Sequence, residues 1–413
     1  MKQNTTDGKK VQHQILRYAG RITKGLSKPK RKFVSQMLFG MQASRDVKLS
    51  NISRSLKEAI RLIKTENRLS DHLKSRDLTP AMNRVLLKEA NQYVKEDSVL
   101  ALDLSDIHKE YAKKMDHLAH VWDGSYGEPR QGYWLLEVIS AEVDDERIVP
   151  LYSEMYSHKV KGFVSENRRI MEAVRVVVEH IKRKGIWVID RGGDRPVLVE
   201  EFDRLKQRFV IRIDERTFTD DKGRERKVKN IVRRMRYEQR YTVKIDKGGY
   251  EEELEISLGM KERLWLNEVE VSLVVVKGFG KDPMLLMTNV DKTPKAILEI
   301  YLTRWKCEET FRFLKQEYHL EDVRVRRYKS LRNTVVLLHA VFYFVSVYLG
   351  QRLRMSILLD KILTKAKRFF EIPAFKHYAV ADGIAHVLFN LGWQAQNVDD
   401  PPDDKRQLLL GFT

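Results

Sequence analysis

The 413-residue chain carries a formal net charge of +19, and 42% of its residues are hydrophobic. This length is typical of two or three domains, or of one domain with a large insertion, and the apolar fraction is enough for a sizeable core. The charge predicts a polyanionic partner, with nucleic acid favoured over an anionic membrane surface or a merely basic cytosolic protein. The single cysteine, Cys307, excludes an internal disulfide and a Cys-rich zinc module, and we interpret it as structural.

The N-terminal part of the chain is strongly basic and has a helical pattern. Its first 60 residues hold fourteen Lys and Arg against three Asp and Glu. The stretch SRDVKLSNISRSL resembles the turn and second helix of a helix-turn-helix, with Ser50 as the N-cap and with Arg54 and Lys57 facing phosphates or bases. A basic helical bundle that touches only the DNA backbone is the alternative. We predict a helical DNA-binding domain over residues 1–95.

Residues 96–204 combine apolar strand-like runs with one amphipathic helix. The runs SVLALDLSDI, YWLLEVISAEV and RIVPLYSEMY precede the helix RRIMEAVRVVVEHIKRKG, which we expect to end at Gly185, and IWVIDRGG follows it. This order predicts a mixed α/β sheet. Asp103 and Asp190 each end a buried run, and a strand delivers such a residue to the rim of a sheet, where ligands bind in α/β folds.

Residues 205–290 alternate apolar and polar side chains, which predicts an antiparallel β segment inserted into the α/β core. Between Lys222 and Lys247 the chain holds eleven Lys and Arg against three Asp and Glu. A charge run usually marks only a solvated surface. In a β insertion beside carboxylates, we interpret it as a surface that contacts DNA.

The chain is predicted to be largely helical after the insertion. Residues 291–350 complete the core, and residues 351–413 form a helical C-terminal region that is a candidate for dimerisation. The apolar run TVVLLHAVFYFVSVYLG, residues 334–350, is shorter than a membrane-spanning helix and contains His339. We interpret it as a buried core helix, with a membrane anchor as the alternative. The polar N-terminus lacks the apolar stretch of a signal peptide.

The stretch YLTRWKCEETFRFLK is expected to form one helix with charged groups on one face. Tyr301, Arg304, Glu308 and Lys315 share that face because they are separated by three, four and seven residues. A carboxylate beside Arg, Lys and Tyr suits a metal site next to a DNA phosphate, where the cations and the phenol hold the backbone. Ordinary ion pairing along an amphipathic helix is the alternative, and the spacing alone does not decide between them.

Three carboxylates from distant parts of a chain can share two Mg²⁺ ions. Hard cations prefer oxygen ligands, and a two-metal site clamps the attacking and leaving oxygens of an in-line phosphoryl transfer. Asp103, Asp190 and Glu308 are the candidates in this chain.

The spacing Tyr301-x2-Arg304-x3-Glu308-x6-Lys315 matches the Y-x2-R-x3-E-x6-K signature of a group of bacterial insertion-sequence DDE transposases. The cut-and-paste, hairpin-forming transposases belong to that group. LALDLSDI and VIDRGGDR are similar to their first and second acidic blocks, and residues 285–316 resemble the whole third block.

The resemblance covers about residues 98–349 and implies a ribonuclease H-like core with an inserted β subdomain. Asp106 is the rival of Asp103, and Glu309 is the rival of Glu308; the register favours the first of each pair. Two Mg²⁺ ions per active site are implied, with Mn²⁺ as a substitute. The resemblance assigns the metal ions to Asp103, Asp190 and Glu308 and the phosphates of the transposon end to Tyr301, Arg304 and Lys315.

One position departs from the resembled pattern. These transposases usually carry a Trp just before the strand that ends the insertion, and it stacks on a base flipped out during hairpin formation; here the residue is Met284. A thioether contacts a base but stacks less well than an indole, so the resemblance supports metal-dependent cleavage better than the hairpin step. Phe279 and Trp265 are the alternative stacking residues.

The resemblance implies a transposase that cleaves DNA at transposon ends and transfers the freed 3′-OH strand into target DNA. Its expected partners are double-stranded DNA, with terminal inverted repeats and a target, and a second copy of the chain in a synaptic complex. We expect it in the cytoplasm, on the nucleoid. The alternatives are a nuclease of the same fold and a domesticated or inactive derivative that regulates transposition, although all three acidic positions are present.

Overall fold

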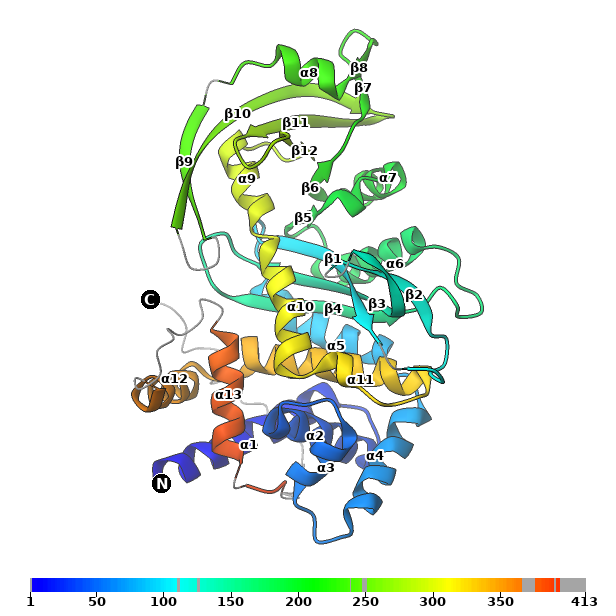
Figure 1. Ribbon diagram of the computed structural model, residues 1–413, viewed down its shortest axis with the longest axis vertical. Helices are drawn as coiled ribbons and strands as arrows, with labels where there is room; N and C mark the ends of the chain where they lie inside the picture. The colour runs from blue at the N-terminus through cyan, green and yellow to red at the C-terminus, as the bar shows by residue number, and fades with distance from the viewer. Residues whose placement is uncertain are drawn as a thin grey trace.

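The computed structural model describes residues 2–109, 112–124, 127–237, 239–246, 251–365, 376–389 and 391–393. Figure 1 shows an elongated molecule with the N-terminal helices and α11–α13 at one end, β7, β8 and α8 at the other, and the centre of the sheet between them. The described strands are β1 (Val99–His108), β2 (Ala119–Asp123), β3 (Glu128–Ala141), β4 (Ile148–Tyr156), β5 (Ile186–Ile189), β6 (Arg208–Ile213), β7 (Thr217–Asp220), β8 (Glu225–Lys227), β9 (Gln239–Asp246), β10 (Glu251–Leu266), β11 (Val269–Lys277) and β12 (Met284–Thr288).

One mixed sheet joins all of these strands. Its order is β2-β3-β1-β5-β6-β12-β11-β10-β7-β8, with β4 on β3 and β9 on β10. β1, β5 and β6 are parallel neighbours, whereas β3 and β12 run antiparallel to them. The prediction of a mixed α/β fold is therefore confirmed.

The segment 205–290 extends the central sheet. β10, β11 and β12 pair antiparallel, as the alternating pattern predicts. β6, however, pairs in parallel with β5 as well as antiparallel with β12, so the same sheet continues from the core into this segment. The boundary at residue 205 therefore falls just before a strand that joins the two parts.

Helices cover the sheet and build the opposite end of the molecule. The short connection η2 (Arg191–Gly193) follows β5, and the five-residue η4 (Phe344–Tyr348) continues α11. The described helices are α1 (Lys2–Ile22), α2 (Lys28–Ser44), α3 (Leu49–Leu56), α4 (Leu62–Ser75), α5 (Thr79–Ala90), α6 (Glu166–Ile181), α7 (Pro196–Arg204), α8 (Val228–Arg234), α9 (Pro294–Leu302), α10 (Trp305–Glu317), α11 (Tyr328–Tyr343), α12 (Gln351–Lys365) and α13 (His377–Leu388). Of the predicted C-terminal region, residues 366–375, 390 and 394–413 lie outside the described residues.

The helix α6 ends earlier than its sequence predicts. Ser165 accepts a hydrogen bond from the Arg168 backbone N–H and caps its start, while Lys182 rather than Gly185 follows its last turn. Gly185 instead precedes β5 with φ +82°, and a Cβ there would lie 2.5 Å from Leu100 Cγ. The glycine is thus required by close packing against β1, not by the helix end.

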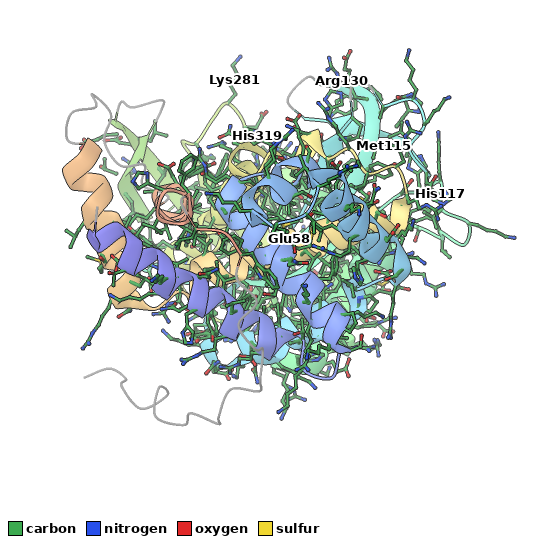
Figure 2. All side chains as sticks on the ribbon, turned by 90° about the horizontal axis from the view of Figure 1, so that it is seen from below. Glu58, Met115, His117, Arg130, Lys281 and His319 are labelled. Carbon is green, nitrogen blue, oxygen red and sulfur yellow. The ribbon has the colours of Figure 1, made fainter. Side chains whose placement is uncertain are left out.

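The N-terminal helices share their apolar core with the rest of the molecule. Residues of α1 to α5 belong to the same buried cluster as β1, β3, β4 and α11. Tyr18 in α1 donates a hydrogen bond to the Ala340 carbonyl of α11, and Leu78 N–H donates to Asn333 Oδ1. Figure 2 views this end of the molecule, with Glu58 among the blue helices; its carboxylate accepts hydrogen bonds from Gln36, Thr65 and Arg68 and ties α2 to α4.

The expected helix-turn-helix contains two helices, α2 and α3, but its predicted cap is wrong. Lys48 is the N-cap of α3, so Ser50 lies inside the first turn. The turn is held by Asp46, whose carboxylate accepts hydrogen bonds from Lys48 N–H at 2.8 Å and from Asn51 Nδ2 at 2.6 Å. A carboxylate two residues upstream therefore replaces the hydroxyl that we expected.

The long apolar helix lies inside the protein. Residues 328–348, formed by α11 and η4, are long and apolar enough to cross a membrane, but 89% of their most apolar stretch is buried within the described structure. α11 packs on β4, α2 and α5. This burial agrees with the interpretation as a core helix.

Candidate active site

Asp103 and Asp190 lie side by side on neighbouring parallel strands. The pairing of β1 with β5 ends at Ala101 opposite Val188, and both aspartates follow two residues later. β1 itself continues to His108, so Asp103 lies within a strand and not at its end. Asp190 directly follows β5 and accepts a hydrogen bond from Gly192 N–H at 2.8 Å, which fixes its side chain at the turn.

The buried guanidinium of Arg304 joins two of the predicted acidic residues. Arg304 is 7% exposed, and its Nη1 lies 2.8 Å from Asp103 Oδ2 while its Nη2 lies 2.6 Å from Glu308 Oε1. Burial opposes its charge, but Asp103, Tyr301 and Glu308 hold the pKa of Arg304 above its usual value. One cation thus serves two carboxylates in a region with little water.

The three predicted acidic residues influence each other electrostatically. Burial raises the pKa of Asp103 to about 7, the Arg304 charge opposes that rise, and the charges of Asp190 and Glu308 add to it. The geometry places Asp190, just after β5, beside Asp103 of β1, and it links Asp103 to Glu308 of α10 through Arg304.

The helix that supplies Arg304 and Glu308 is not continuous, so the predicted single helix is wrong. α9 ends at Leu302 and α10 begins at Trp305. Between them, Arg304 N–H bonds to the Tyr301 carbonyl and Cys307 N–H to the Arg304 carbonyl, a three-residue spacing that tightens the turn.

Tyr301 is buried beside Arg304 at this turn. Tyr301 is 3% exposed in a second apolar cluster, and its ring centroid is 5.9 Å from Arg304 Cζ. Trp305 is 54% exposed, and its ring centroid is also 5.9 Å from Arg304 Cζ. Sequence reasoning missed this exposed indole, although its position between two cations, Arg304 and Lys306, was a signal.

The rival acidic residues have partners of their own. Asp106 is 8% exposed and lies 3.1 Å from Lys315 Nζ, which also lies 3.1 Å from Glu321 Oε1. Glu309 pairs with Arg312 on α10. The geometry thus separates Asp103 from Asp106 and Glu308 from Glu309, and it engages Lys315 with carboxylates instead of leaving it free for a phosphate.

In the described structure, the other residues predicted to contact DNA make no hydrogen bond or ion pair with Asp103, Asp190 or Glu308. Met284 in β12 is 9% exposed and packs in the same apolar cluster as Tyr301, with Phe279 at its edge. Arg54 on α3 is exposed and donates to Asn51 Oδ1. Lys57 follows α3 and donates to the Phe389 carbonyl at 2.7 Å.

A buried polar contact that the sequence reasoning missed lies next to Asp103. Glu137 in β3 stands directly opposite Asp103 in β1, and its carboxylate meets His339 Nδ1 of α11 at 3.1 Å. Both side chains are almost fully buried, and burial followed by the charges of Asp103 and Glu137 raises the pKa of the Cys307 thiol. A charged residue within the apolar run WLLEVIS was the available signal. The buried, protonated thiol agrees with a structural role for Cys307.

Among the described residues, no three His, Cys, Asp or Glu side chains are grouped closely enough to hold a metal ion as they stand. The donor chemistry nevertheless fits a hard cation, because every predicted ligand is a carboxylate. Arg304 now provides the positive charge that Asp103 and Glu308 share. The two carboxylates would bind a metal ion only after the guanidinium turns away.

Residues 154–344, somewhat less than half of the chain, match the family model of the transposase DDE domain. The matched range includes Asp190 and Glu308 and begins after Asp103. No curated protein matches the chain. Among solved structures, the chain is similar to piggyBac transposase in a synaptic complex with hairpin DNA, with a TM-score of 0.43, 8% sequence identity and coverage of 92% of this chain and 78% of that chain. The family match supports a DDE transposase, whereas a structural likeness this weak adds nothing to it.

Proposed function

We propose that this chain is a DNA transposase whose acidic cluster, Asp103, Asp190 and Glu308, holds divalent metal ions for phosphodiester cleavage and strand transfer. The observation that supports this most is the pairing of Asp103 and Glu308, far apart in sequence, through the buried guanidinium of Arg304, with Asp190 just beyond the neighbouring parallel strand. Structural ion pairs rarely leave a carboxyl with a pKa near 7, because stable pairs lower that value. The match to the transposase DDE domain supports the same reaction class.

Two Mg²⁺ ions, or Mn²⁺ in their place, are the proposed cofactors. Such ions would activate a water or a 3′-OH and stabilise the leaving oxygen. The chain's own contribution is electrostatic. The negative charges of Asp190 and Glu308 disfavour the ionised form of Asp103, and a divalent cation offsets this repulsion better than one guanidinium. Released from its carboxylates, Arg304 becomes a cation free to bind a DNA phosphate beside the metal.

The proposed core is ribonuclease H-like. The proposed relatives are the bacterial insertion-sequence transposases that carry the Y-x2-R-x3-E-x6-K signature. Lys315 lies near the surface, with a side chain 20% exposed, and it reaches a phosphate if Asp106 or Glu321 releases it. The substrates are duplex transposon ends and target DNA, a second copy of the chain completes a synaptic complex, and the protein works on the cytoplasmic nucleoid.

The test uses DNA from either side of the gene as substrate, with Mg²⁺ or Mn²⁺. Glu308→Gln should abolish cleavage at the element boundary while leaving DNA binding intact, because the amide keeps the shape but loses the charge that holds the metal ion. Glu309→Gln is the matched control: it makes the same change one residue away, at a side chain that pairs with Arg312, and it should cleave normally.

Equal cleavage by wild type and Glu308→Gln would remove Glu308 from the metal site. Binding of the ends without cleavage by the wild-type protein, with either metal ion, would instead favour a regulatory derivative. A hairpin product on the cut ends would show that the hairpin step proceeds with Met284 in place of Trp.

A further inference from the structure

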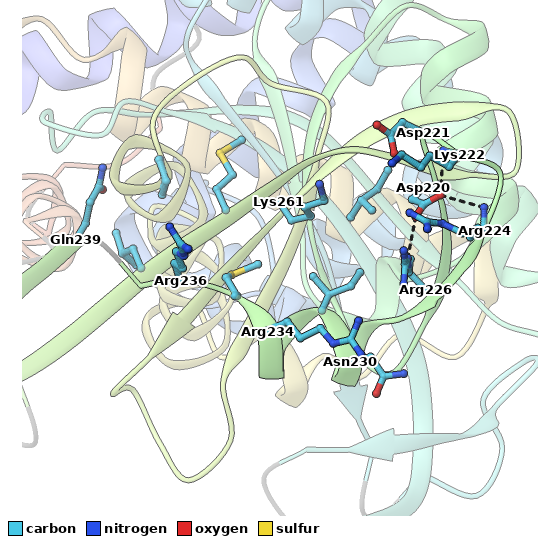
Figure 3. A pocket seen from close by; sticks show the side chains of 17 residues that line it. Asp220, Asp221, Lys222, Arg224, Arg226, Asn230, Arg234, Arg236, Gln239 and Lys261 are labelled. Atoms are coloured by element: carbon cyan, nitrogen blue, oxygen red, sulfur yellow. Dashed lines mark hydrogen bonds and ion pairs between the residues drawn. The ribbon is translucent and has the colours of Figure 1, made fainter.

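A cavity of about 710 Å³ lies at the β-rich end of the molecule. The β7–β8 hairpin, α8, the segment after it and β10 form its walls, and Pro294 at the start of α9 lines one side (Figure 3). Cavities of roughly 300–1,000 Å³ enclose small molecules. This one is therefore large enough for a nucleotide of a single strand and too small to enclose a duplex.

The lining of the cavity is strongly basic. Two carboxylates, Asp220 and Asp221, face six cations there. These six are Lys222, Arg224, Arg226, Arg234, Arg236 and Lys261. This excess of positive charge favours binding of an anionic ligand, because like charges held close together repel one another.

Internal ion pairs account for only part of this charge. Asp220 is 7% exposed and accepts hydrogen bonds from Arg226 Nε at 2.8 Å and from Arg224 Nε at 3.1 Å, which fixes the β7–β8 hairpin. Figure 3 shows these bonds at one end of the cavity. Within the described part of the chain, the other cations form no ion pair; they are Lys222, Arg234, Arg236 and Lys261.

The cavity also has an apolar side. Leu258 and Leu264 are buried in β10, and Met235 and Met260 are half-buried beside them. At Gly259 an added Cβ would lie 2.6 Å from Met235 Sδ, so the segment after α8 lies directly on the backbone of β10. Flexible thioethers provide a soft surface for a flat ring.

The cations are spread along the cavity and do not surround one point. In Figure 3, Lys261 lies between the Asp220–Arg226 group on one side and Arg236 and Gln239 on the other. A single phosphate would meet only one or two of these groups. An extended polyanion would meet several in turn.

We propose that this cavity binds a single strand of DNA, with its phosphates on Arg234, Arg236 and Lys261 and one base against Met235 and Met260. Only the origin of this strand, as part of the transposase substrate, rests on the proposed function. α9 begins at the cavity and ends beside Arg304, a path of roughly 12 Å at the helical rise of 1.5 Å per residue. This helix therefore joins the edge of the cavity to the candidate active site.

The first test measures binding of a fluorescent single-stranded oligonucleotide by anisotropy, in EDTA and in the Glu308→Gln background. The variant Arg234→Ala with Arg236→Ala should weaken binding roughly tenfold at low salt. It should also reduce the slope of log Kd against log salt by about 1.4, because each single-strand phosphate that is no longer neutralised lowers the slope by about 0.7. Arg233→Ala is the matched control, because Arg233 is exposed on the same helix and does not line the cavity.

A second test isolates the interaction with the base. Met260→Ala should weaken binding of an oligothymidylate about threefold but leave binding of an abasic strand of equal length unchanged. Equal weakening for both strands would remove the base from the proposed site.

The proposal is overturned if the control Arg233→Ala reduces the salt slope by about 0.7, half of the change expected for the double variant. It is also overturned if the double variant binds the single strand as wild type does. Because binding is measured without metal ions and with an inert Glu308→Gln site, failure of cleavage leaves this result standing, and failure here leaves the cleavage test standing.

Discussion

Two arginine sites in this molecule differ in burial and in ion pairing. Arg304 is 7% exposed and binds two carboxylates, one of which, Asp103, has a pKa raised to about 7. Arg234 and Arg236 are exposed at the rim of a cavity and pair with no carboxylate in the described structure. The same side chain therefore acts as an internal counterion in one place and as an open binding group in the other.

The difference teaches that net charge alone does not locate a nucleic-acid contact. A paired, buried cation contributes to folding and becomes available to DNA only when its carboxylates find another positive charge. An unpaired, exposed cation contributes little to folding and is available at once. The following substitutions test this contrast, beginning with the largest expected effect.

Asp103→Asn should change the pH dependence of stability most. The pKa of Asp103 is about 7 in the folded protein against 3.8 in the unfolded chain, so the folded state keeps a proton that the unfolded state releases. Its contribution to the free energy of unfolding is fully present below about pH 4 and is lost as pH rises through 7, by up to about 4 kcal/mol. Without divalent metal ions, wild type should therefore lose stability relative to Asp103→Asn between pH 4 and pH 8, as urea unfolding would measure.

Asp97→Asn is a control with the opposite sign. A hydrogen bond from Lys292 lowers the pKa of Asp97, so its contribution is present above the unfolded pKa and is lost as pH falls. Its side chain is 59% exposed, so the effect should be much smaller. If the free energy of unfolding of wild type and of Asp103→Asn changed with pH in parallel, the raised pKa of Asp103 would be contradicted.

Arg304→Ala should lower the free energy of unfolding by about 3 kcal/mol at pH 8, because it leaves Asp103 and Glu308 without their shared cation. Arg312→Ala is the comparison: its side chain is 53% exposed and pairs with Glu309, so the loss should stay below about 1 kcal/mol. Added Mg²⁺ should restore more stability to Arg304→Ala than to wild type, because no guanidinium competes for the carboxylates. Equal destabilisation by the two substitutions would show that Arg304 is no internal counterion.

Local patterns in the sequence single out the candidate acidic residues. Apolar runs that lead into Asp103 and Asp190 imply buried strands, and the parallel pairing of β1 with β5 up to Ala101 and Val188 sets the two aspartates side by side. The preference for Glu308 over Glu309 came from the register of the signature and agrees with the geometry, in which Glu309 turns toward Arg312.

The features that the sequence did not predict depend on long-range strand pairing or on a break between two helices. The neighbour of Asp103 across the sheet, Glu137, is set by the pairing of β1 with β3, which no short-range pattern encodes. The turn at Arg304 is invisible because the spacing of the signature runs through it without a Gly or Pro. The N-terminal helices read as a separate basic domain, yet Tyr18 and Leu78 join them to α11, so deleting residues 1–60 would expose core and would not isolate a DNA contact.

The smallest expected effect completes the contrast. Replacing both Arg234 and Arg236 by Ala should change the free energy of unfolding by less than about 0.5 kcal/mol, because exposed side chains without partners contribute little to the folded state. The same variant should lose single-strand affinity, whereas Arg304→Ala loses stability first. Urea unfolding and anisotropy on one set of variants therefore separate the two kinds of arginine. A large loss of stability in the cavity variant would mean that its cations support the fold, and the distinction between counterion and binding group would fail.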